Sequence, residues 1–364
     1  MNQAAQKPIV VMAGGTGGHV FPALAVAEYL RLQGETIIWF GTRAGIEARV
    51  VPAADFAIEW LNVQGLRGKG LATLILAPFK LIHACWQAFV TLMRLRPKAV
   101  LGMGGFVSGP GGLMAWILNI PLFLHEQNSV IGLTNRLLSR VARKTYFAFP
   151  VLAGKMPRSE CIGNPVRSDL IDLPAPEARL ADRRGKPVNL LVIGGSLGAA
   201  SLNRVIPEAI SQLDTAERPV VKHQCGNSHL KTCEQHYRDA SVEAEIFGFI
   251  DNMREVYEWA DLVVCRAGAL TIAELTAVGI ASILIPYPFA VDNHQYHNAL
   301  FLEQNKAARI LLEHQLDAVT LALQLRYFQQ NREALVEMSI RAREQAKTDA
   351  TGQLAQGILA GVLS

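Results

Sequence analysis

The sequence has few of the features that mark secreted, zinc-binding or membrane-spanning proteins. Its five cysteines include no C-x-x-C pair and no spacing typical of a zinc site, which argues against a disulfide framework and a zinc ribbon. No run reaches the roughly 18 to 20 uninterrupted apolar residues that a membrane-spanning helix requires. No signal peptide precedes the first apolar run, so we expect the protein in a reducing cytoplasm.

Acidic residues are scarce in the front part of the chain. Residues 1–163 carry 16 Lys and Arg against 7 Asp and Glu, whereas the remainder carries 19 against 24. The front part is therefore the better candidate for an anionic surface or substrate. Half of the 364 residues are apolar and 18% are charged, which excludes a disordered chain and a coiled coil and predicts a globular protein with a sizeable core.

Two strand–turn–helix patterns open the two halves of the chain. In the first, a strand at 9–13 is followed by a glycine turn at 14–19 and a helix at 22–32. In the second, the strand lies at 190–193, the turn at 194–199 and the helix at 203–213. Further short apolar runs alternate with helix-like segments, at 36–40, 99–101, 121–124, 145–149, 220–224, 244–247, 262–265 and 282–286. This alternation predicts parallel sheets with helices on both faces.

The economical interpretation is an α/β protein of two tandem, doubly wound, Rossmann-like domains that face a cleft. We place the junction near Gly163-Asn164-Pro165, which gives domains at 1–163 and 164–340. A final helix, from about 332 to 363, either completes the second domain or packs back on the first over about 340–364. Because ligands of open parallel sheets sit beyond the carboxyl ends of the strands, both glycine turns should face the cleft.

Glycine-rich turns follow three of the predicted strands, at 14–18, 102–112 and 194–198. Such a turn lets the backbone approach a phosphate, and the next helix offers unpaired N–H groups. None matches G-x-G-x-x-G with an acidic residue about 20 positions on, and G-x-x-x-x-G-K-[ST] is absent, so neither a nicotinamide site nor a nucleoside triphosphatase loop is supported. Tight turns and helix packing are the alternative for each one, but three together favour a diphosphate-bearing ligand.

Polar side chains follow several of these strands. Glu274 lies one helical turn beyond the strand at 262–265, where a carboxylate can accept both hydroxyls of a ribose or merely complement the helix dipole. His19 follows the first glycine turn, where a helix N-terminus would keep its ring neutral and able to take a proton; capping or packing is the alternative. The segment 292–298 is dense in amides and imidazoles and suits a polyhydroxylated ligand, with a surface helix start as the alternative.

Several enzyme classes are excluded by motif. H-E-Q-N at 125–128 is not the H-E-x-x-H of zinc proteases, and no G-x-S-x-G or protein-kinase signature is present. The H-E-Q-N segment remains as a polar cluster at the cleft, in which Glu126 is a second candidate to take a proton.

The segment from Leu71 to Met93 is amphipathic and basic. It is interrupted by Pro78, which predicts a kink or a split into two helices, and Lys69 and Lys80 lie beside or within it. Its apolar stripe, which includes Trp86 and Phe89, suits the surface of an anionic bilayer. The alternative is that the stripe packs into the domain core.

Taken together, the motifs resemble the MurG family of bacterial N-acetylglucosaminyltransferases over nearly the whole chain. The matching segments are G-G-T-G-G-H at 14, G-G-F-V-S-G-P-G-G at 104, H-E-Q-N at 125, G-N-P-V-R at 163, G-G-S-L-G-A at 194 and R-A-G-A-L-T-I-A-E at 266. The segment before Gln295 departs from the family pattern, because Asn293 and His294 precede the glutamine.

The resemblance implies a GT-B fold and an inverting transfer that needs no metal and no cofactor. The donor would be UDP-N-acetylglucosamine, and the acceptor would be the 4-hydroxyl of the N-acetylmuramyl sugar of undecaprenyl-diphospho-muramoyl-pentapeptide, a step of peptidoglycan synthesis that supports cell shape and division. Such a polyisoprenyl-diphosphate-linked acceptor implies peripheral attachment to an anionic membrane surface, the cytoplasmic face of the inner membrane. No nucleic-acid partner is expected.

Carried over motif by motif, the resemblance places the donor mainly on the second domain. Ser196 would meet the diphosphate, Arg167 and the backbone near Ile250 the nucleotide, and Glu274 the ribose. The remaining expected contacts, with the sugar and phosphate, are Ala269, Leu270, Thr271, Ile272, Ala273 and Gln295 in the second domain and Thr16, Gly17, Gly18 and Asn128 in the first. His19 is the candidate general base, with Glu126 or a water chain as alternatives.

Two other classes of function stay open at this point. One is a non-catalytic module that binds a nucleotide sugar or a polyisoprenyl diphosphate, against which the intact His19, Ser196, Glu274 and Gln295 argue. The other is an enzyme of the same fold that glycosylates a different lipid.

Overall fold

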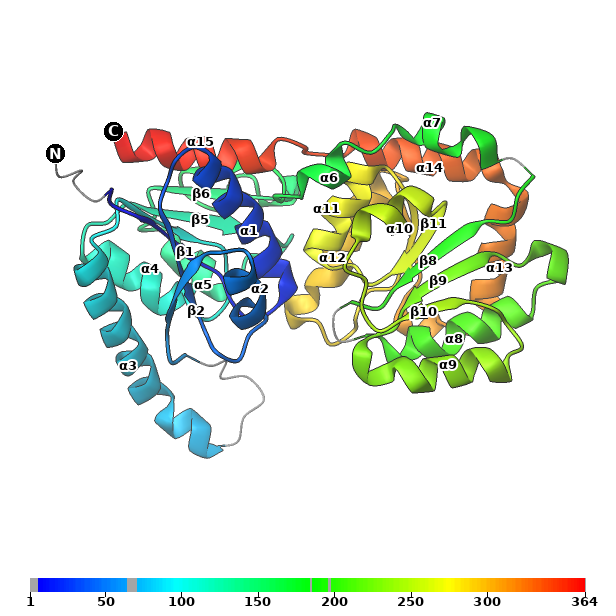
Figure 1. Ribbon diagram of the computed structural model, residues 1–364, viewed down its shortest axis with the longest axis horizontal. Helices are drawn as coiled ribbons and strands as arrows, with labels where there is room; N and C mark the ends of the chain where they lie inside the picture. Colours follow the sequence, from blue (N-terminus) through cyan, green and yellow to red (C-terminus); the bar gives the residue numbers. More distant parts are fainter. Residues whose placement is uncertain (1–5, 64–70, 184, 196–197, 364) are drawn as a thin grey trace. The chain divides into compact units, whose positions relative to one another are not determined.

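The chain folds into two compact units, each with its own sheet and core (Figure 1). The computed structural model describes residues 6–63, 71–183, 185–195 and 198–363. The first unit comprises Met1–Val166 together with Thr348–Ser364, and the second comprises Arg167–Lys347. The backbone therefore passes between the units twice, once after Val166 and once after Lys347.

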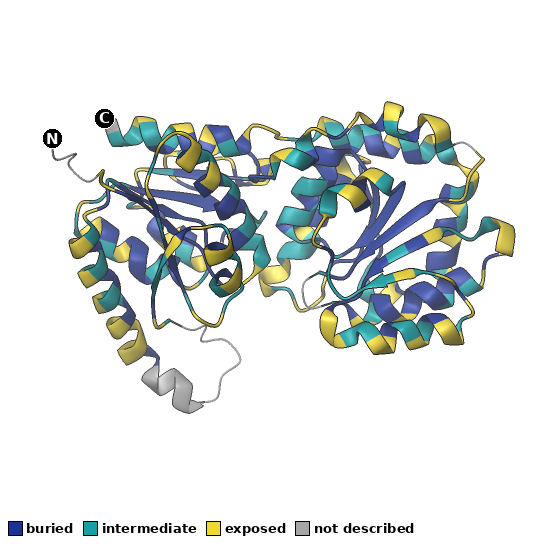
Figure 2. Ribbon diagram, in the orientation of Figure 1, coloured by how far each residue is buried: buried dark blue, intermediate teal, exposed yellow. Residues whose placement is uncertain are grey.

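The sheet of the first unit is parallel, with the strand order β3-β2-β1-β4-β5-β6-β7. Its strands are β1 (Ile9–Met12), β2 (Ile37–Gly41), β3 (Ala57–Trp60), β4 (Ala99–Gly102), β5 (Leu122–Glu126), β6 (Lys144–Phe147) and β7 (Ser159–Cys161). Strand β1 lies inside the sheet between β2 and β4, with Ile9 opposite Ile37 on one side and Ala99 on the other. Every residue of β1 is apolar and buried, as a strand covered on both faces requires (Figure 2).

Helices cover both faces of this sheet. They are α1 (Gly17–Leu32), α2 (Glu47–Ala53), α3 (Leu71–Leu95), α4 (Ser108–Ile117), α5 (Leu133–Leu138) and α15 (Ala350–Leu363). Because side chains alternate along a strand, Val11 packs in the core on the side of α1 and α15, while Val10 and Met12 pack in the core on the side of α3 and α4.

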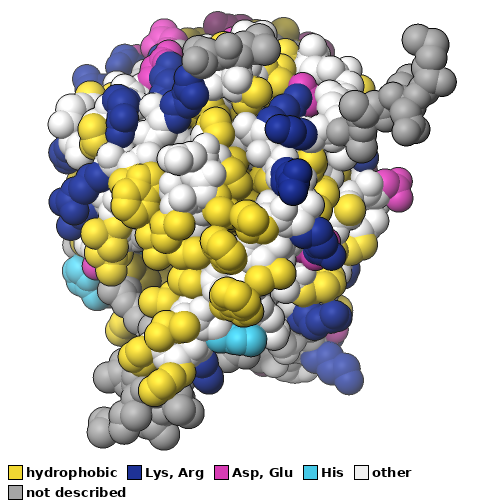
Figure 3. Space-filling view, turned by 90° about the vertical axis from the view of Figure 1, so that its left-hand side faces the viewer, with side chains coloured by type: hydrophobic (Ala, Val, Ile, Leu, Met, Phe, Trp, Pro, Cys, Tyr) yellow, Lys and Arg dark blue, Asp and Glu magenta, His cyan; other side chains and the backbone are white. Residues whose placement is uncertain are grey.

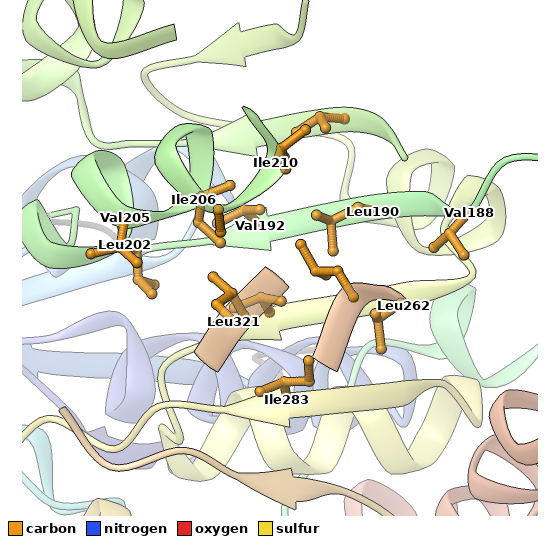
Figure 4. Close-up of a cluster of buried hydrophobic side chains, with 14 of the residues drawn as sticks. Val188, Leu190, Val192, Leu202, Val205, Ile206, Ile210, Leu262, Ile283 and Leu321 are labelled. Atoms are coloured by element: carbon orange, nitrogen blue, oxygen red, sulfur yellow. The ribbon is translucent and has the colours of Figure 1, made fainter. Parts of the chain in front are cut away.

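The second unit repeats the design with the parallel order β10-β9-β8-β11-β12-β13. Its strands are β8 (Asn189–Ile193), β9 (Val220–Gln224), β10 (Glu245–Phe247), β11 (Leu262–Cys265), β12 (Ala281–Leu284) and β13 (Arg309–Ile310). Its helices are α6 (Ser168–Ile171), α7 (Pro176–Leu180), α8 (Ala200–Ser211), α9 (Leu230–Asp239), α10 (Met253–Trp259), α11 (Ala269–Val278), α12 (His294–Gln304), α13 (Ala318–Gln330) and α14 (Arg332–Glu344). Leu190 and Val192 of β8 pack with Ile206 of α8 and Leu321 of α13 in its core (Figure 4).

The predicted fold class is confirmed, with two differences in detail. The strands that the sequence did not reveal, β3, β7 and β13, are short or partly exposed and lie at sheet edges. The prediction of one final helix was wrong, because the chain leaves the helix after Glu344 and starts a new one at Ala350. Helix α14 belongs to the second unit and α15 to the first.

Candidate active site

Two turns of the first unit meet at the carboxyl edge of its sheet. Strands β1 and β4 are parallel neighbours, so the segments that follow them emerge side by side. The Met103 amide donates a hydrogen bond of 2.9 Å to the Met12 carbonyl. Gly105 adopts a φ of +80°, and a Cβ there would overlap the carbonyl oxygen of Gly14. The second glycine turn therefore needs its glycine in order to pack against the first.

The ring of His19, which follows the first glycine turn, lies against the second glycine turn. His19 is the third residue of α1, and its Nδ1 is 3.2 Å from Oε1 of Gln127, which follows β5. A Cβ on Gly104, where φ is +92°, would lie 2.6 Å from the same nitrogen. The structure thus brings together three predicted motifs: the first glycine turn, the second glycine turn and the H-E-Q-N segment.

Both carboxylate oxygens of Glu126 accept hydrogen bonds from the residues that follow it. Its carboxylate is 3% exposed and accepts hydrogen bonds from the Asn128 amide at 3.1 Å, the Gly132 amide at 3.0 Å and Asn135 Nδ2 at 2.9 Å. These donors hold both oxygens, which favours His19 over Glu126 as the proton acceptor. They also fix the position of Asn128, a predicted sugar contact.

His125 is the second imidazole in this region. It is fully buried, and its Nε2 lies 2.8 Å from the Gly163 carbonyl oxygen. Burial lowers the pKa of His125 to about 4, so its ring is neutral at physiological pH. The neutral ring donates Nε2–H to that carbonyl and anchors the end of β5 to the segment that leaves the first unit.

The sequence did not reveal the role of Glu47, whose carboxylate holds the backbone of the first glycine turn. Its side chain is 0% exposed, and its carboxylate accepts hydrogen bonds from the Gly15 amide at 2.9 Å and from the Thr42 amide and hydroxyl at 2.9 and 2.7 Å. The available signal was an acidic residue seven positions beyond the strand predicted at 36–40. Charge-assisted bonds of this kind hold a turn more firmly than neutral ones.

The equivalent turn of the second unit follows β8. Gly198 adopts a φ of +77°, and a Cβ there would overlap the Cys225 carbonyl, so this glycine is needed for close packing against the end of β9. Gly195 has a φ of +84° with open space around its Cα, and its carbonyl accepts a hydrogen bond from Gln224 Nε2 at 3.2 Å. The predicted diphosphate contact Ser196 lies outside the described residues.

Glu274 lies in α11, which begins directly beyond β11. Its Oε2 accepts a hydrogen bond of 3.1 Å from the hydroxyl of Tyr257, a partner that the sequence did not reveal. Burial raises the pKa of Glu274 to about 6, against the opposing effects of the Arg167 guanidinium and the Tyr257 hydrogen bond. Arg167, the predicted nucleotide contact at the start of α6, therefore acts on the predicted ribose contact, while its own ion pair with Asp169 is long, at 3.9 Å.

The other predicted donor contacts lie on neighbouring segments of the second unit. Ala269 to Ala273 form the first turns of α11, and Ile250 is a buried residue in the loop after β10. Gln295 lies at the start of α12, where its Oε1 accepts a hydrogen bond of 3.0 Å from the Tyr287 amide. Its amide NH₂ is consequently the group that could donate to a ligand. Asn298 Nδ2 donates to the Ala267 carbonyl at 3.2 Å and ties α12 to the loop before α11.

A pocket of about 540 Å³ lies beside the start of α12. Its lining is mostly apolar and aromatic, and comprises Pro286, Pro288, Phe289, Asn293, Tyr296, Leu312, Glu313 and His314. Glu313 forms an ion pair with Arg266, which also donates to the Ser201 hydroxyl at 3.1 Å. Over the described ranges of the chain, no group of three or more His, Cys, Asp or Glu side chains is placed to hold a metal ion.

Comparison with known proteins identifies the relatives of this chain. Residues 9–147 match the N-terminal domain of glycosyltransferase family 28, and residues 189–354 match its C-terminal domain. The UDP-N-acetylglucosamine--N-acetylmuramyl-(pentapeptide) pyrophosphoryl-undecaprenol N-acetylglucosamine transferase of Paraburkholderia xenovorans (strain LB400) is 47% identical over 98% of this chain and 95% of its own length. Its namesake from Alkalilimnicola ehrlichii is 49% identical over 96% and 97%. The crystal structure of Acinetobacter baumannii MurG matches with a TM-score of 0.83 and 39% identity, covering 97% of this chain and 99% of that one.

The chain belongs to the MurG family. It is a hexosyltransferase of the GT-B type, so the resemblance predicted from the motifs and the predicted enzyme class are both confirmed. The roles of individual MurG-type site residues in this chain stay predictions.

Proposed function

We propose that this chain transfers N-acetylglucosamine from UDP-N-acetylglucosamine to the 4-hydroxyl of the N-acetylmuramyl sugar in undecaprenyl-diphospho-muramoyl-pentapeptide. The observation that carries the proposal is the identity of 47 to 49% with transferases of that name over nearly the whole length of both chains. The intact glycine-rich motifs and the half-buried Glu274 with its Tyr257 hydrogen bond also argue against a binding module that has lost its activity.

In this proposal the second unit holds the donor. Glu274 accepts the ribose hydroxyls, the turn after β8 and the N-terminus of α8 stabilise the departing diphosphate, and the Gln295 amide donates to the sugar. Backbone N–H groups and a helix N-terminus can stabilise the leaving group without a cation, so we expect full activity in the presence of a chelator. Loss of activity in EDTA that Mg²⁺ or Mn²⁺ restores would contradict this.

The first unit provides the acceptor side. His19 takes the proton of the acceptor hydroxyl as that oxygen bonds to the anomeric carbon and the bond to the diphosphate breaks. Positioned proton transfer contributes roughly 10² to 10⁴ in rate, so His19→Ala should lose activity in that range and still bind UDP. A His19→Ala variant with wild-type turnover would leave the ring a structural role only.

An acceptor comparison separates the remaining alternatives. Purified protein is incubated with UDP-N-acetylglucosamine and either the lipid-linked muramyl-pentapeptide or a diacylglycerol acceptor, and both UDP release and the disaccharide product are measured. We expect product with the muramyl acceptor alone. Turnover only with the diacylglycerol would indicate a glycolipid synthase, and binding without turnover would indicate a non-catalytic module.

We further propose that α3 docks the protein on the cytoplasmic face of an anionic membrane. Helix α3 runs unbroken from Leu71 to Leu95 with Pro78 inside it. Its buried side chains include Ala84, Ala88 and Leu92, and the last two belong to the core cluster that also contains Val10 and Met12 of β1. Its large apolar side chains point the other way. The exposed ones are Phe79, Leu81, Ile82, Trp86, Val90 and Met93, with exposed fractions between 46% and 69%.

This exposed stripe continues onto the neighbouring helices. Trp116 and Ile117 of α4 and Leu133 and Leu137 of α5 are also exposed, and Figure 3 shows hydrophobic side chains gathered over this face with Lys and Arg around them. Large contiguous apolar patches on a protein surface mark interaction sites, and basic side chains beside one suit anionic headgroups. None of the helices in the described part of the chain is long and apolar enough to cross a membrane. A peripheral contact is therefore the form of attachment that we propose.

A further inference from the structure

We propose that Gln127 is a positioning residue that holds His19 in the tautomer protonated on Nδ1, so that the lone pair of Nε2 faces the proton to be taken. The inference rests on the proposed transfer reaction, in which His19 receives the proton of the acceptor hydroxyl. It assigns a task to the third residue of the H-E-Q-N segment, which the site described so far leaves without one.

The Met103 carbonyl determines which atom of the Gln127 side-chain amide is the nitrogen and which is the oxygen. The side chain is 1% exposed, and one of its two amide atoms lies 2.7 Å from the Met103 carbonyl oxygen. A carbonyl can only accept, so that atom is the NH₂ group and the other is the oxygen Oε1. The oxygen in turn can only accept, and its neighbour is His19 Nδ1 at 3.2 Å. Nδ1 must therefore carry the hydrogen, and in a neutral ring Nε2 then carries the lone pair.

The backbone on both sides of the Gln127 side chain is held by hydrogen bonds. Met103 is fixed through its amide, which donates to the Met12 carbonyl, and the backbone carbonyl of Gln127 accepts a hydrogen bond of 3.0 Å from Asn164 Nδ2. The ring itself lies against Gly104, whose carbonyl is held by the Ser108 hydroxyl at 2.8 Å. The hydrogen bond from Nδ1 thus has a fixed acceptor rather than a mobile side chain.

An amide at this position has a consequence that a carboxylate would not have. Among the described residues, the titratable groups on the neighbouring elements include His125 on β5, which burial keeps neutral, Glu126 on β5, whose oxygens accept hydrogen bonds from the following loop, and Glu47 on α2, which accepts one from the Gly15 amide. A neutral Gln127 orients the ring without stabilising its protonated form, so the base stays deprotonated at lower pH than it would beside a carboxylate.

The tautomer can be read directly by NMR. In protein labelled with ¹⁵N at histidine, long-range ¹H–¹⁵N spectra distinguish a protonated ring nitrogen from an unprotonated one, and His19→Gln identifies the signals of His19. We expect Nδ1 protonated and Nε2 unprotonated in the wild-type protein, and a mixture of tautomers in Gln127→Leu. A wild-type ring protonated on Nε2 would overturn the proposal, whatever the enzyme does with its substrates.

The pH profile of kcat provides the second test. In Gln127→Glu the new carboxylate should raise the pKa of the His19 ring and move the acidic limb of the profile to higher pH by about 1 unit or more. In Gln127→Leu we expect kcat to fall about 10-fold or more, with UDP binding unchanged. Ser139→Ala is the matched control, since it removes another hydrogen bond of a buried side chain in the first unit, from the Ser139 hydroxyl to the Arg136 carbonyl at 3.1 Å, and should leave the tautomer and the shape of the pH profile as they are. An unshifted limb in a folded Gln127→Glu variant would contradict the proposal, whereas an inactive wild-type chain would contradict only the proposed function.

Discussion

Gly18 illustrates how a single residue can point to a ligand. It lies in the first turn of α1, outside the left-handed region, and a Cβ there would meet only the Thr16 hydroxyl, at 3.8 Å. Neither the backbone nor the packing of the chain itself requires glycine at this position. The absence of a side chain instead leaves room for something that approaches from outside, as expected for a contact with the donor sugar.

The prediction for Gly18→Ala is a protein that folds at least as well and works less well. Alanine in place of glycine in a helix should preserve or raise the free energy of unfolding, by up to about 1 kcal/mol. If a substrate group occupies the space, kcat/KM should fall about 10-fold or more. Thermal denaturation and steady-state kinetics check the two halves, and a variant with normal kinetics would show that no ligand approaches this position.

Glu274 predicts a pH dependence of donor affinity. Its carboxyl group has a pKa of about 6, and only the ionised form can accept both ribose hydroxyls. Affinity should thus be constant above this pKa and should fall as the pH drops through it. Calorimetric titration with UDP-N-acetylglucosamine measures this, since a diphosphate esterified at both ends does not titrate near pH 6.

Two variants isolate the contribution of Glu274 to this effect. Glu274→Gln should bind the donor about 10- to 100-fold more weakly, because it loses a charge-assisted contact of roughly 1.5 to 3 kcal/mol, and its affinity should not vary around pH 6. Tyr257→Phe removes a hydrogen bond that lowers the pKa, so the midpoint should move to higher pH. Unchanged affinity in Glu274→Gln would remove this residue from the donor site.

At the scale of elements, the two faces of α3 differ in the size of their side chains, which distinguishes a helix that packs its whole apolar stripe into the core from one that exposes it to a membrane. Its buried face is built from small residues such as Ala84 and Ala88, while Phe79 and Trp86 are more than 60% exposed. Replacing Phe79 and Trp86 by Ser together with Lys80→Glu should weaken co-sedimentation with anionic vesicles at least 10-fold, because each side chain loses roughly 1.5 to 3 kcal/mol of apolar burial in the interface.

The control for α3 is an equally exposed apolar residue on the other unit. Leu323 on α13 is 56% exposed, and Leu323→Ser should leave vesicle binding unchanged. The melting temperature should be preserved in both variants, since neither removes a buried side chain. If the α3 variant sediments as the wild type does, the membrane contact lies on another face.

The elements show which parts of the site a sequence can reveal. Glycine turns after buried strands could be predicted, because each motif is local and the parallel order brings strand ends to one edge. Glu47, Gln127 and Tyr257 act on residues between 17 and 108 positions away in the chain, and no local pattern specifies those pairs. The end of α14 was missed for another reason, since 345–349 contains no glycine or proline to mark the break.

At the scale of the molecule, the first unit is completed by the last helix of the chain. Leu354, Ala355 and Ile358 of α15 are fully buried in the core of the first unit. Gly357 allows this close approach, because a Cβ there would overlap the buried Tyr146 hydroxyl on β6.

A substitution in α15 should consequently destabilise one unit and spare the other. We expect Gly357→Ala to lower the stability of the first unit by about 1 to 3 kcal/mol through overpacking. If the second unit binds UDP as proposed, the calorimetric transition that UDP raises belongs to that unit and should keep its midpoint in this variant. Equal shifts of both transitions would show that the two units melt together.

The separation of α15 from the rest of its unit by the whole second unit also bears on how the protein is made. A ribosome completes β1 to β7 early, but the apolar surface that α15 covers stays open until residues 350–363 have been synthesised, after the whole second unit. The second unit has all its elements before then, so it can close first, during synthesis. We expect the nascent first unit to expose apolar surface throughout that interval, and a variant that lacks residues 350–363 to leave this surface uncovered.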